Sequence, residues 1–221
     1  MTLVLPIIAG YCDTITFVSA DKIFSAHVTG NFIVFAYQLV KGADEDAWIK
    51  LLCFPVFMLA VMTGGWIAAK FSSRHFVLCC EGVILILAGL MAYSIGYIEN
   101  AMISWPVYLV TMVIVFAMGL QNAFGKLFAK ETYGPTTMMT GNVTQFALDI
   151  RSYLVSGIKR AEYIHALGAG LVTLGGFLTG CFLGAYMGKL FGLAGVCIAG
   201  LAMVICYFYT KSAAVTAGNK L

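Results

Sequence analysis

The chain carries one short polar stretch twice, and this duplication constrains the fold more than any other feature. In the first half, Gly10 precedes the glycine of a Thr29-Gly30-Asn31 motif by 20 residues. In the second half, Gly119 precedes the glycine of a Thr140-Gly141-Asn142 motif by 22 residues. A repeat of this kind indicates that one structural unit occurs twice in the fold.

Each motif is followed by an apolar segment that is too short to cross a membrane. The segments run from Phe32 to Val40 and from Val143 to Ile150. Ten helical residues cover about 15 Å, whereas the hydrocarbon core of a bilayer is about 30 Å thick. We therefore predict a broken or re-entrant half-helix at each Thr-Gly-Asn motif, an arrangement that brings backbone polar groups to the middle of the membrane.

Composition indicates an all-α integral membrane protein. Of the 221 residues, 61% are hydrophobic and 10% are charged, against about a quarter charged in soluble domains. A net charge of +3 gives no reason to expect a nucleic-acid partner. The seven cysteines and three histidines lack metal-ligand spacing, so we expect no metal and no cofactor. No separable signal peptide is expected, because the apolar N-terminal run lacks a basic beginning and contains a polar interruption.

The hydrophobic pattern predicts one membrane domain made of two repeats, residues 1–100 and residues 101–221. We expect the first span to be broken near Gly10 to Asp13, and a hydrophilic loop to separate the second half-helix from the next span. The six predicted full spans are Met1–Ala20, Leu51–Ala69, Phe76–Ile98, Pro106–Phe124, Ala166–Met187 and Gly192–Tyr209.

The basic residues favour one of two topologies. If both half-helices re-enter, each repeat has three spans and the second repeat is inverted. If both cross, there are eight spans and the repeats are parallel. The six-span topology divides the basic residues nine against four, and the eight-span topology seven against six. The positive-inside bias thus favours six spans with both termini in the cytoplasm. The nine are Lys70, Arg74, Lys126, Lys130, Arg151, Lys159, Arg160, Lys211 and Lys220, and the four are Lys22, Lys41, Lys50 and Lys189.

Ionisable residues inside the apolar spans are costly and are therefore candidates for function. Asp13 lies in the middle of the first span, and its counterpart in the second repeat is the uncharged Asn122. Glu81 lies within the third span, and His27 directly precedes the first half-helix. We predict that Asp13, Glu81 and His27 couple proton movement to transport. The alternatives are that Asp13 caps a restarted helix and that Glu81 reaches the membrane surface.

The polar groups of both motifs are the predicted substrate-binding site. A helix N-terminus favours an anion or a carbonyl oxygen, and two such ends entering from opposite leaflets would converge on one centre. The alternative is that the threonines and asparagines only cap their helices. The predicted binding residues are Asp13, Thr29, Gly30, Asn31, Gln121, Asn122, Thr140, Gly141 and Asn142.

Four glycines repeat every four residues along one face of the fifth span. Small residues at this spacing let another helix approach closely. The partner helix belongs either to this chain or to a second copy, so a homo-oligomer through this face is an open alternative. The four residues are Gly176, Gly180, Gly184 and Gly188.

The linked motifs resemble those of the YoaK-like family of small bacterial membrane proteins. They read Gly10-Tyr-x-Asp13-x-x-x-Phe17, then Phe24-x-Ala26-His27-x-Thr29-Gly30-Asn31, then Gly119-x-Gln121-Asn122, then Thr137-x-x-Thr140-Gly141-Asn142. The likeness covers essentially the whole chain. It implies a multi-pass protein of the bacterial cytoplasmic (inner) membrane with permease-like character, and it supplies no substrate.

Three functions are compatible with these features. The leading hypothesis is a small secondary transporter for a small polar or anionic organic solute, bound at mid-membrane between the repeats and proton-coupled through Asp13 or Glu81. The second is a passive channel for a small solute or ion. The third is an intramembrane enzyme using Asp13, Glu81 and His27; no catalytic spacing favours it, so we do not expect an enzyme.

Overall fold

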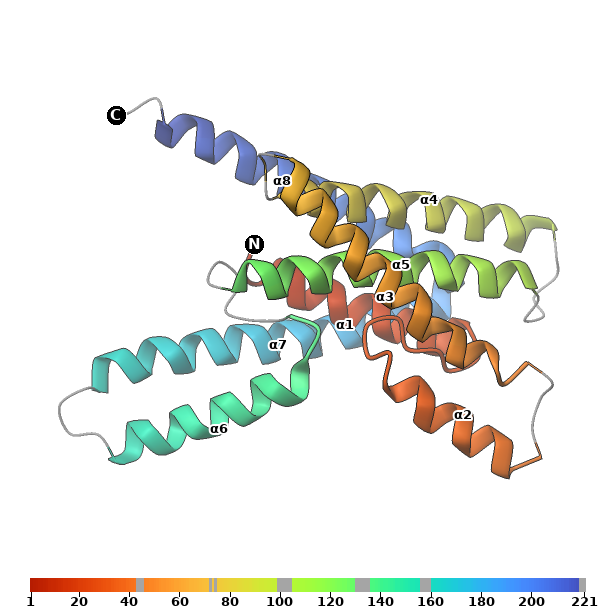
Figure 1. Ribbon diagram of the computed structural model, residues 1–221, viewed down its shortest axis with the longest axis horizontal. Helices are drawn as coiled ribbons and strands as arrows, with labels where there is room; N and C mark the ends of the chain where they lie inside the picture. The colour runs from red at the N-terminus through yellow and green to blue at the C-terminus, as the bar shows by residue number, and fades with distance from the viewer. Residues whose placement is uncertain are drawn as a thin grey trace.

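Helices make up every regular element in the part of the chain that the structure describes. The computed structural model describes residues 1–42, 46–71, 73, 75–98, 105–129, 136–155 and 160–218 (Figure 1). The elements are α1 (Val4–Ser19), α2 (Gly30–Val40), α3 (Ile49–Lys70), α4 (Phe76–Ile98), α5 (Trp105–Leu127), α6 (Met139–Val155), α7 (Arg160–Phe191), the 3₁₀ turn η2 (Gly192–Gly195) and α8 (Val196–Gly218). The all-α prediction is confirmed.

The predicted spans correspond to six of these helices, with two corrections. The bounds of α4 are those predicted, and α3 and α5 extend a few residues beyond theirs. The expected break at Gly10 to Asp13 is wrong, because α1 is one continuous helix. The second half-helix was predicted too short: α6 has 17 residues where α2 has 11. It continues through Arg151 to Val155, inside the predicted hydrophilic loop. Of the basic residues used to predict topology, Arg74, Lys130, Lys159 and Lys220 lie outside the described residues.

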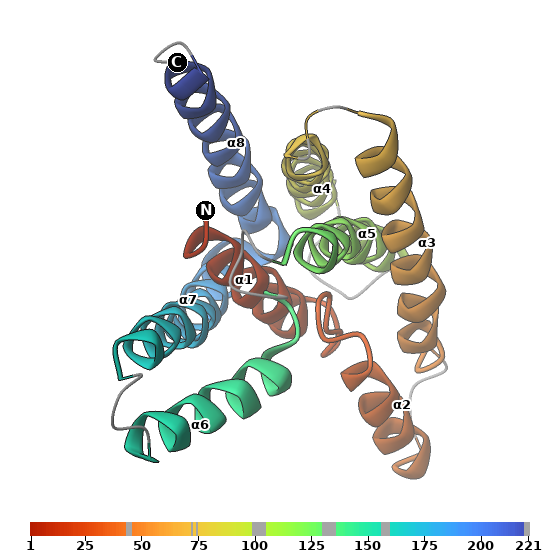
Figure 2. The same ribbon diagram turned by 60° about the vertical axis from the view of Figure 1, so that its left-hand side comes forward.

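The two halves of the chain exchange their long helices. The first helix of the first half, α1, packs against α7, and the first helix of the second half, α5, packs against α3. The last helices of the halves, α4 and α8, pack against each other. Figure 1 shows α1 and α5 running in opposite directions, and α2 and α6 starting near the centre of the molecule and diverging toward opposite ends. Figure 2 shows the same two helices splaying away from α1.

The core lies between α1, α4, α5 and α8. Leu5, Leu85, Ile114, Met118 and Met203, which come from these four helices, are fully enclosed. Burying large aliphatic side chains from segments so distant in sequence ties the halves into one body.

The glycine-rich face of α7 is covered by α1 of the same chain. A Cβ added at Gly180 would lie 2.0 Å from the carbonyl oxygen of Ile7, and one at Gly184 would lie 2.4 Å from that of Tyr11. No side chain fits in such a space, so the glycines allow direct backbone contact between the helices. The partner helix of this face in the structure is therefore α1 of the same chain.

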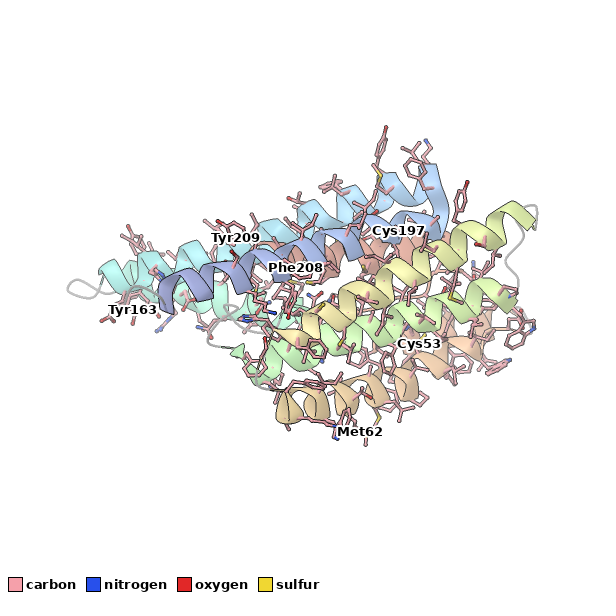
Figure 3. All side chains as sticks on the ribbon, turned by 90° about the horizontal axis from the view of Figure 1, so that it is seen from above. Cys53, Met62, Tyr163, Cys197, Phe208 and Tyr209 are labelled. Carbon is pink, nitrogen blue, oxygen red and sulfur yellow. The ribbon has the colours of Figure 1, made fainter. Side chains whose placement is uncertain are left out.

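The outer surface of the bundle is apolar. Met62 on α3 is 67% exposed and Tyr209 on α8 is 78% exposed (Figure 3). Within the described residues, four helical stretches are long and apolar enough to cross a membrane: Ile49–Lys70, Phe76–Gly96, Trp105–Leu127 and Glu162–Ser212, the last of which runs from α7 into α8. These features support a membrane protein.

Candidate functional site

Asp13 holds the connector between α1 and α2. Its Oδ1 accepts hydrogen bonds from the backbone N–H groups of Ala26, at 2.8 Å, and His27, at 3.2 Å. Its Oδ2 lies 2.6 Å from Nδ1 of His27. Asp13 is only 4% exposed, so its charge is compensated by these three partners rather than by water. The predicted capping role is thus replaced by a cross-link from the middle of α1 to the start of α2.

Asn31 also fastens this connector. Its side-chain oxygen accepts a hydrogen bond from the backbone N–H of Phe24, its amide donates to the carbonyl oxygen of Phe24, and both distances are 2.8 Å. Asn31 is completely buried. The backbone of the connector therefore uses both ends of the amide of Asn31, which the sequence analysis predicted to bind substrate.

The connector between α5 and α6 is also fastened by side chains of the preceding helix, Gln121 and Asn122 of α5, but neither is charged. The hydroxyl of Thr137 donates to Oδ1 of Asn122 at 2.5 Å. The side-chain amide of Gln121 donates to the hydroxyl of Thr136 at 2.9 Å and to the carbonyl oxygen of Leu5 at 2.8 Å. Through Gln121, the connector of the second half is tied to the first helix of the first half.

The starts of α2 and α6 face one cleft of about 400 Å³. It lies where the two connectors meet, and α3 and α5 contribute the rest of its wall. The residues that line it are Ala26, His27, Val28, Thr29, Phe54, Phe57, Asn122, Thr137, Met138, Met139, Thr140 and Gly141. Residues from both Thr-Gly-Asn motifs, 111 positions apart in the sequence, therefore share one site.

His27 is the titratable side chain in the wall of this cleft. Its side chain is 31% exposed, and its ring packs edge-on against Phe177 of α7, with 5.4 Å between ring centroids. Because Nδ1 is engaged by Asp13, Nε2 is the nitrogen through which the ring can exchange a proton or bind a solute. A carboxylate at hydrogen-bond distance stabilises the protonated imidazole.

The hydroxyls of Thr29 and Thr140 add neutral polar groups. Thr29 is exposed and makes no capping hydrogen bond with its side chain. Thr140 is also exposed, one residue before Gly141, where an added Cβ would meet no atom within 4 Å. The cleft thus combines an imidazole, an amide and hydroxyl groups with apolar walls, a set that can bind a small polar molecule.

Comparison with known proteins identifies the family. The model of a family described as "Protein of unknown function (DUF1275)" matches residues 1–209. The chain belongs to this family. No curated protein and no solved structure matches it. The family agrees with the resemblance seen in the sequence motifs and assigns no activity to its members.

Some residues predicted for the site of this DUF1275 member do not line the cleft. Gln121 is fully buried behind it, and Asn142 lines a different cleft, between α6 and α7. Gly30 does not line the cleft either, and a Cβ added there would lie 3.0 Å from the ring of Phe24. Glu81 is fully buried in α4, and within the described part of the chain neither of its carboxylate oxygens has a hydrogen-bond partner.

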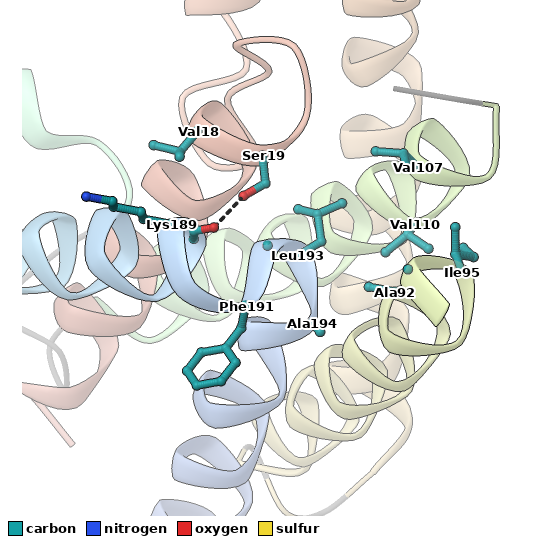
Figure 4. Close-up of a pocket in the computed structure, with 13 residues that line it drawn as sticks. Val18, Ser19, Ala92, Ile95, Val107, Val110, Lys189, Phe191, Leu193 and Ala194 are labelled. Carbon is teal, nitrogen blue, oxygen red and sulfur yellow. Dashed lines mark hydrogen bonds between the residues drawn. The ribbon is translucent and has the colours of Figure 1, made fainter. Parts of the chain in front are cut away.

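Sequence reasoning missed the apolar wall of the cleft. Phe54 and Phe57 of α3, with Met138 and Met139 before and at the start of α6, supply it. In a chain this apolar, such residues carry no signal that separates a site wall from a lipid-facing surface. A further cavity of about 450 Å³ lies between α1, α4, α5 and α7 (Figure 4). It is lined mostly by apolar residues and contains none of the predicted site residues.

Proposed function

We propose that the protein is a small secondary transporter of the bacterial cytoplasmic membrane for a small polar or anionic organic solute. The observation that carries this proposal is the shared cleft, in which Thr29 from one half meets Thr140 and Gly141 from the other. A volume of about 400 Å³ suits a small metabolite. Binding sites of this class lie between two repeats, at the ends of short helices.

Inverted repeats give this site its place in the membrane. In the proposed topology α1, α3, α4, α5, α7 and α8 cross the bilayer, and α2 and α6 re-enter from opposite faces and begin at mid-depth. The exchanged packing of α1 on α7 and α5 on α3 supports it, as do the opposite directions of α1 and α5 (Figure 1). Both termini then lie on the side that the positive-inside bias assigns to the cytoplasm.

Proton coupling would use the pair formed by Asp13 and His27. The pair lies between the buried end of the first connector and the cleft, so a proton on the imidazole and a solute in the cleft would influence each other directly. Glu81 is a second candidate, because its carboxylate is fully buried in α4 and has no hydrogen-bond partner among the residues that the structure describes.

The first experiment identifies the solute and tests the site. Purified protein is screened against polar and anionic metabolites for a shift in melting temperature, and each hit is tested for uptake into proteoliposomes with and without a pH gradient. Uptake against a solute gradient supports the transporter. Rapid downhill flux that never concentrates the solute supports the passive channel.

A matched pair of variants on one helix tests the location of the site. We expect Thr140→Val to weaken binding of the solute about tenfold, because a hydroxyl facing it is lost. Thr144→Val is the control, since Thr144 is exposed and its hydroxyl bonds to the backbone oxygen of Thr140 instead. Equal binding by Thr140→Val and the unaltered protein would remove the cleft from the proposal.

A further inference from the structure

One end of the first half is closed by a buried ion pair. The ammonium group of Lys50, near the start of α3, contacts the carboxylate of Asp21 just after α1. The side chain of Lys50 is 0% exposed. The amide nitrogen of Gln38, near the end of α2, lies 3.3 and 3.4 Å from the two oxygens of the same carboxylate. Three segments are thus fastened together at one point.

The layer beneath this ion pair is also closed. Ile23 and Val28 of the first connector pack with Ile49 and Cys53 of α3 in a separate apolar cluster. Asp21 itself has a φ of 47°, in the left-handed region that side chains rarely adopt. The ammonium group of Lys50 and the amide of Gln38 both bind the side chain of this residue. The ion pair and this apolar cluster together join the first connector to α3.

The equivalent place in the second half is an open, polar cleft of about 350 Å³ between α6 and α7. Asn142, Gln145, Asp149, His165 and Thr173 contribute its polar lining. Asp149 receives a hydrogen bond from its own helix, from the amide of Gln145 at 2.9 Å. So many polar side chains between two membrane helices are compatible with water there and not with lipid.

The sequence explains why only one of the two places is closed. Gln38 and Asp149 both stand nine residues after the threonine of their motifs. Lys50 stands 13 residues before the Thr-Gly of its long helix, at Thr63, and the residue 13 before the matching Thr179 is Ala166. Ala166 lines the open cleft. Among the residues that line this cleft, the second half therefore has the acidic Asp149 but no lysine.

We infer that Asp21, Gln38 and Lys50 form the closed gate of the transporter, and that the cleft between α6 and α7 is its open entrance. This inference rests on the proposed function in treating the protein as a transporter. The difference in access between the two ends does not depend on that proposal. Breaking a buried ion pair costs free energy. The pair therefore keeps the α2 side closed until solute binding or a conformational change provides that free energy.

Cysteine labelling tests the gate without a transported solute. The reporter is Met138→Cys, in the wall of the central cleft, and the unaltered chain with its native cysteines is the blank. A membrane-impermeant maleimide is applied to right-side-out and inside-out vesicles. We expect position 138 to react about tenfold faster from the side of the α6–α7 connection than from the side of the α2–α3 connection. Equal rates from both sides would overturn the gate.

Two further substitutions test the residues named. In the reporter background, Lys50→Met is expected to raise the labelling rate from the α2 side several-fold. Ala166→Lys is expected to lower the rate from the α6 side several-fold, because it places an ammonium group opposite Asp149. If Lys50→Met does not give folded protein, the result of Ala166→Lys decides, and an unchanged rate there overturns the inference. Asymmetric labelling in a protein that transports nothing would support the gate and refute the proposed function. Coupled uptake with symmetric labelling would support the proposed function and refute the gate.

Discussion

The two connectors occupy matching positions in the two halves but are fastened by different chemistry. Asp13 stands three residues after Gly10, and Asn122 stands three residues after Gly119. The carboxylate of Asp13 binds two backbone N–H groups and an imidazole, whereas the amide oxygen of Asn122 binds the hydroxyl of Thr137. The neutral copy teaches that holding a connector against its helix needs an acceptor at this position but no charge.

Fastening the connector therefore does not by itself account for the charge in the first copy. Placing a carboxylate at 4% exposure costs free energy that an asparagine would avoid. The imidazole that compensates it lines the cleft, and the second copy has Met138 in the corresponding position one residue after Thr137. This asymmetry is what a proton-sensitive binding site requires, and the experiments below compare the halves in order of expected effect.

The largest effect is expected at the glycines where the exchanged helices touch. A Cβ at Gly10 would lie 2.2 Å from the carbonyl oxygen of Phe177, and one at Gly119 would lie 2.4 Å from Cβ of Ala60. We expect Gly10→Ala to lower the free energy of unfolding by about 3 kcal/mol and Gly119→Ala by about 2 kcal/mol, as overpacking does. Gly65→Ala, with no atom within 4 Å of the added Cβ, is the control. Melting in detergent, followed by size-exclusion chromatography, measures the order. A Gly10→Ala protein as stable as the control would contradict the close packing of α1 on α7.

The next effect is expected from removing the two acceptors that hold the connectors. Asp13→Ala leaves two buried N–H groups and the His27 ring without their acceptor, so we expect a loss of about 2.5 kcal/mol. Asn122→Ala removes the acceptor of one hydroxyl, and the expected loss is about 1 kcal/mol. The same melting measurement compares them. Equal losses would mean that the charge of Asp13 adds nothing to the first connector.

Smaller losses are expected at the two motif asparagines. Asn31→Ala removes both side-chain hydrogen bonds to the backbone of Phe24. The expected loss in the free energy of unfolding is about 2 kcal/mol. Asn142 is half-buried and contacts the sulfur of Met139 at 3.8 Å, so Asn142→Ala is expected to cost about 0.5 kcal/mol. A larger loss at Asn142 than at Asn31 would reverse the structural roles assigned to the two copies.

The sequence predicted the long helices well because their apolar lengths leave few alternatives. It failed at Gly10 to Asp13, where a glycine and a carboxylate looked like a break in the helix. In the structure, Gly10 allows α7 to pack closely against α1, and the side chain of Asp13 binds the connector. Neither residue interrupts the backbone hydrogen bonds of α1, which stays one continuous helix. The length of α6 was missed because hydropathy falls at Asp149 and Arg151, although both residues tolerate a helix.

Convergence of the motifs could be predicted from the duplication, but the roles of individual residues could not. Thr29 and Thr140 face the cleft, whereas Asn31 turns back to Phe24, and nothing in a Thr-Gly-Asn triplet distinguishes these outcomes. The sequence analysis counted Lys50 only among the basic residues that indicate topology, whereas the structure buries its side chain completely. Its partner, Asp21, lies 29 residues away in the sequence, and a single sequence gives no signal for that pairing.

The most direct test of the charged copy is Asp13→Asn, a variant with a small expected effect on stability. The asparagine oxygen can still accept hydrogen bonds from the N–H groups of Ala26 and His27, so the expected loss is about 1 kcal/mol. The variant removes the hydrogen-bonded carboxylate that raises the pKa of His27, so the ring is expected to lose its proton at a lower pH. We therefore expect the pH dependence of solute uptake into proteoliposomes to flatten while the folded protein is retained. Glu162→Gln, an equally isosteric change at an exposed residue in the first turn of α7, is expected to keep the original pH profile. If both variants keep it, the Asp13–His27 pair serves only to hold the connector, and the difference between the two halves is structural rather than functional.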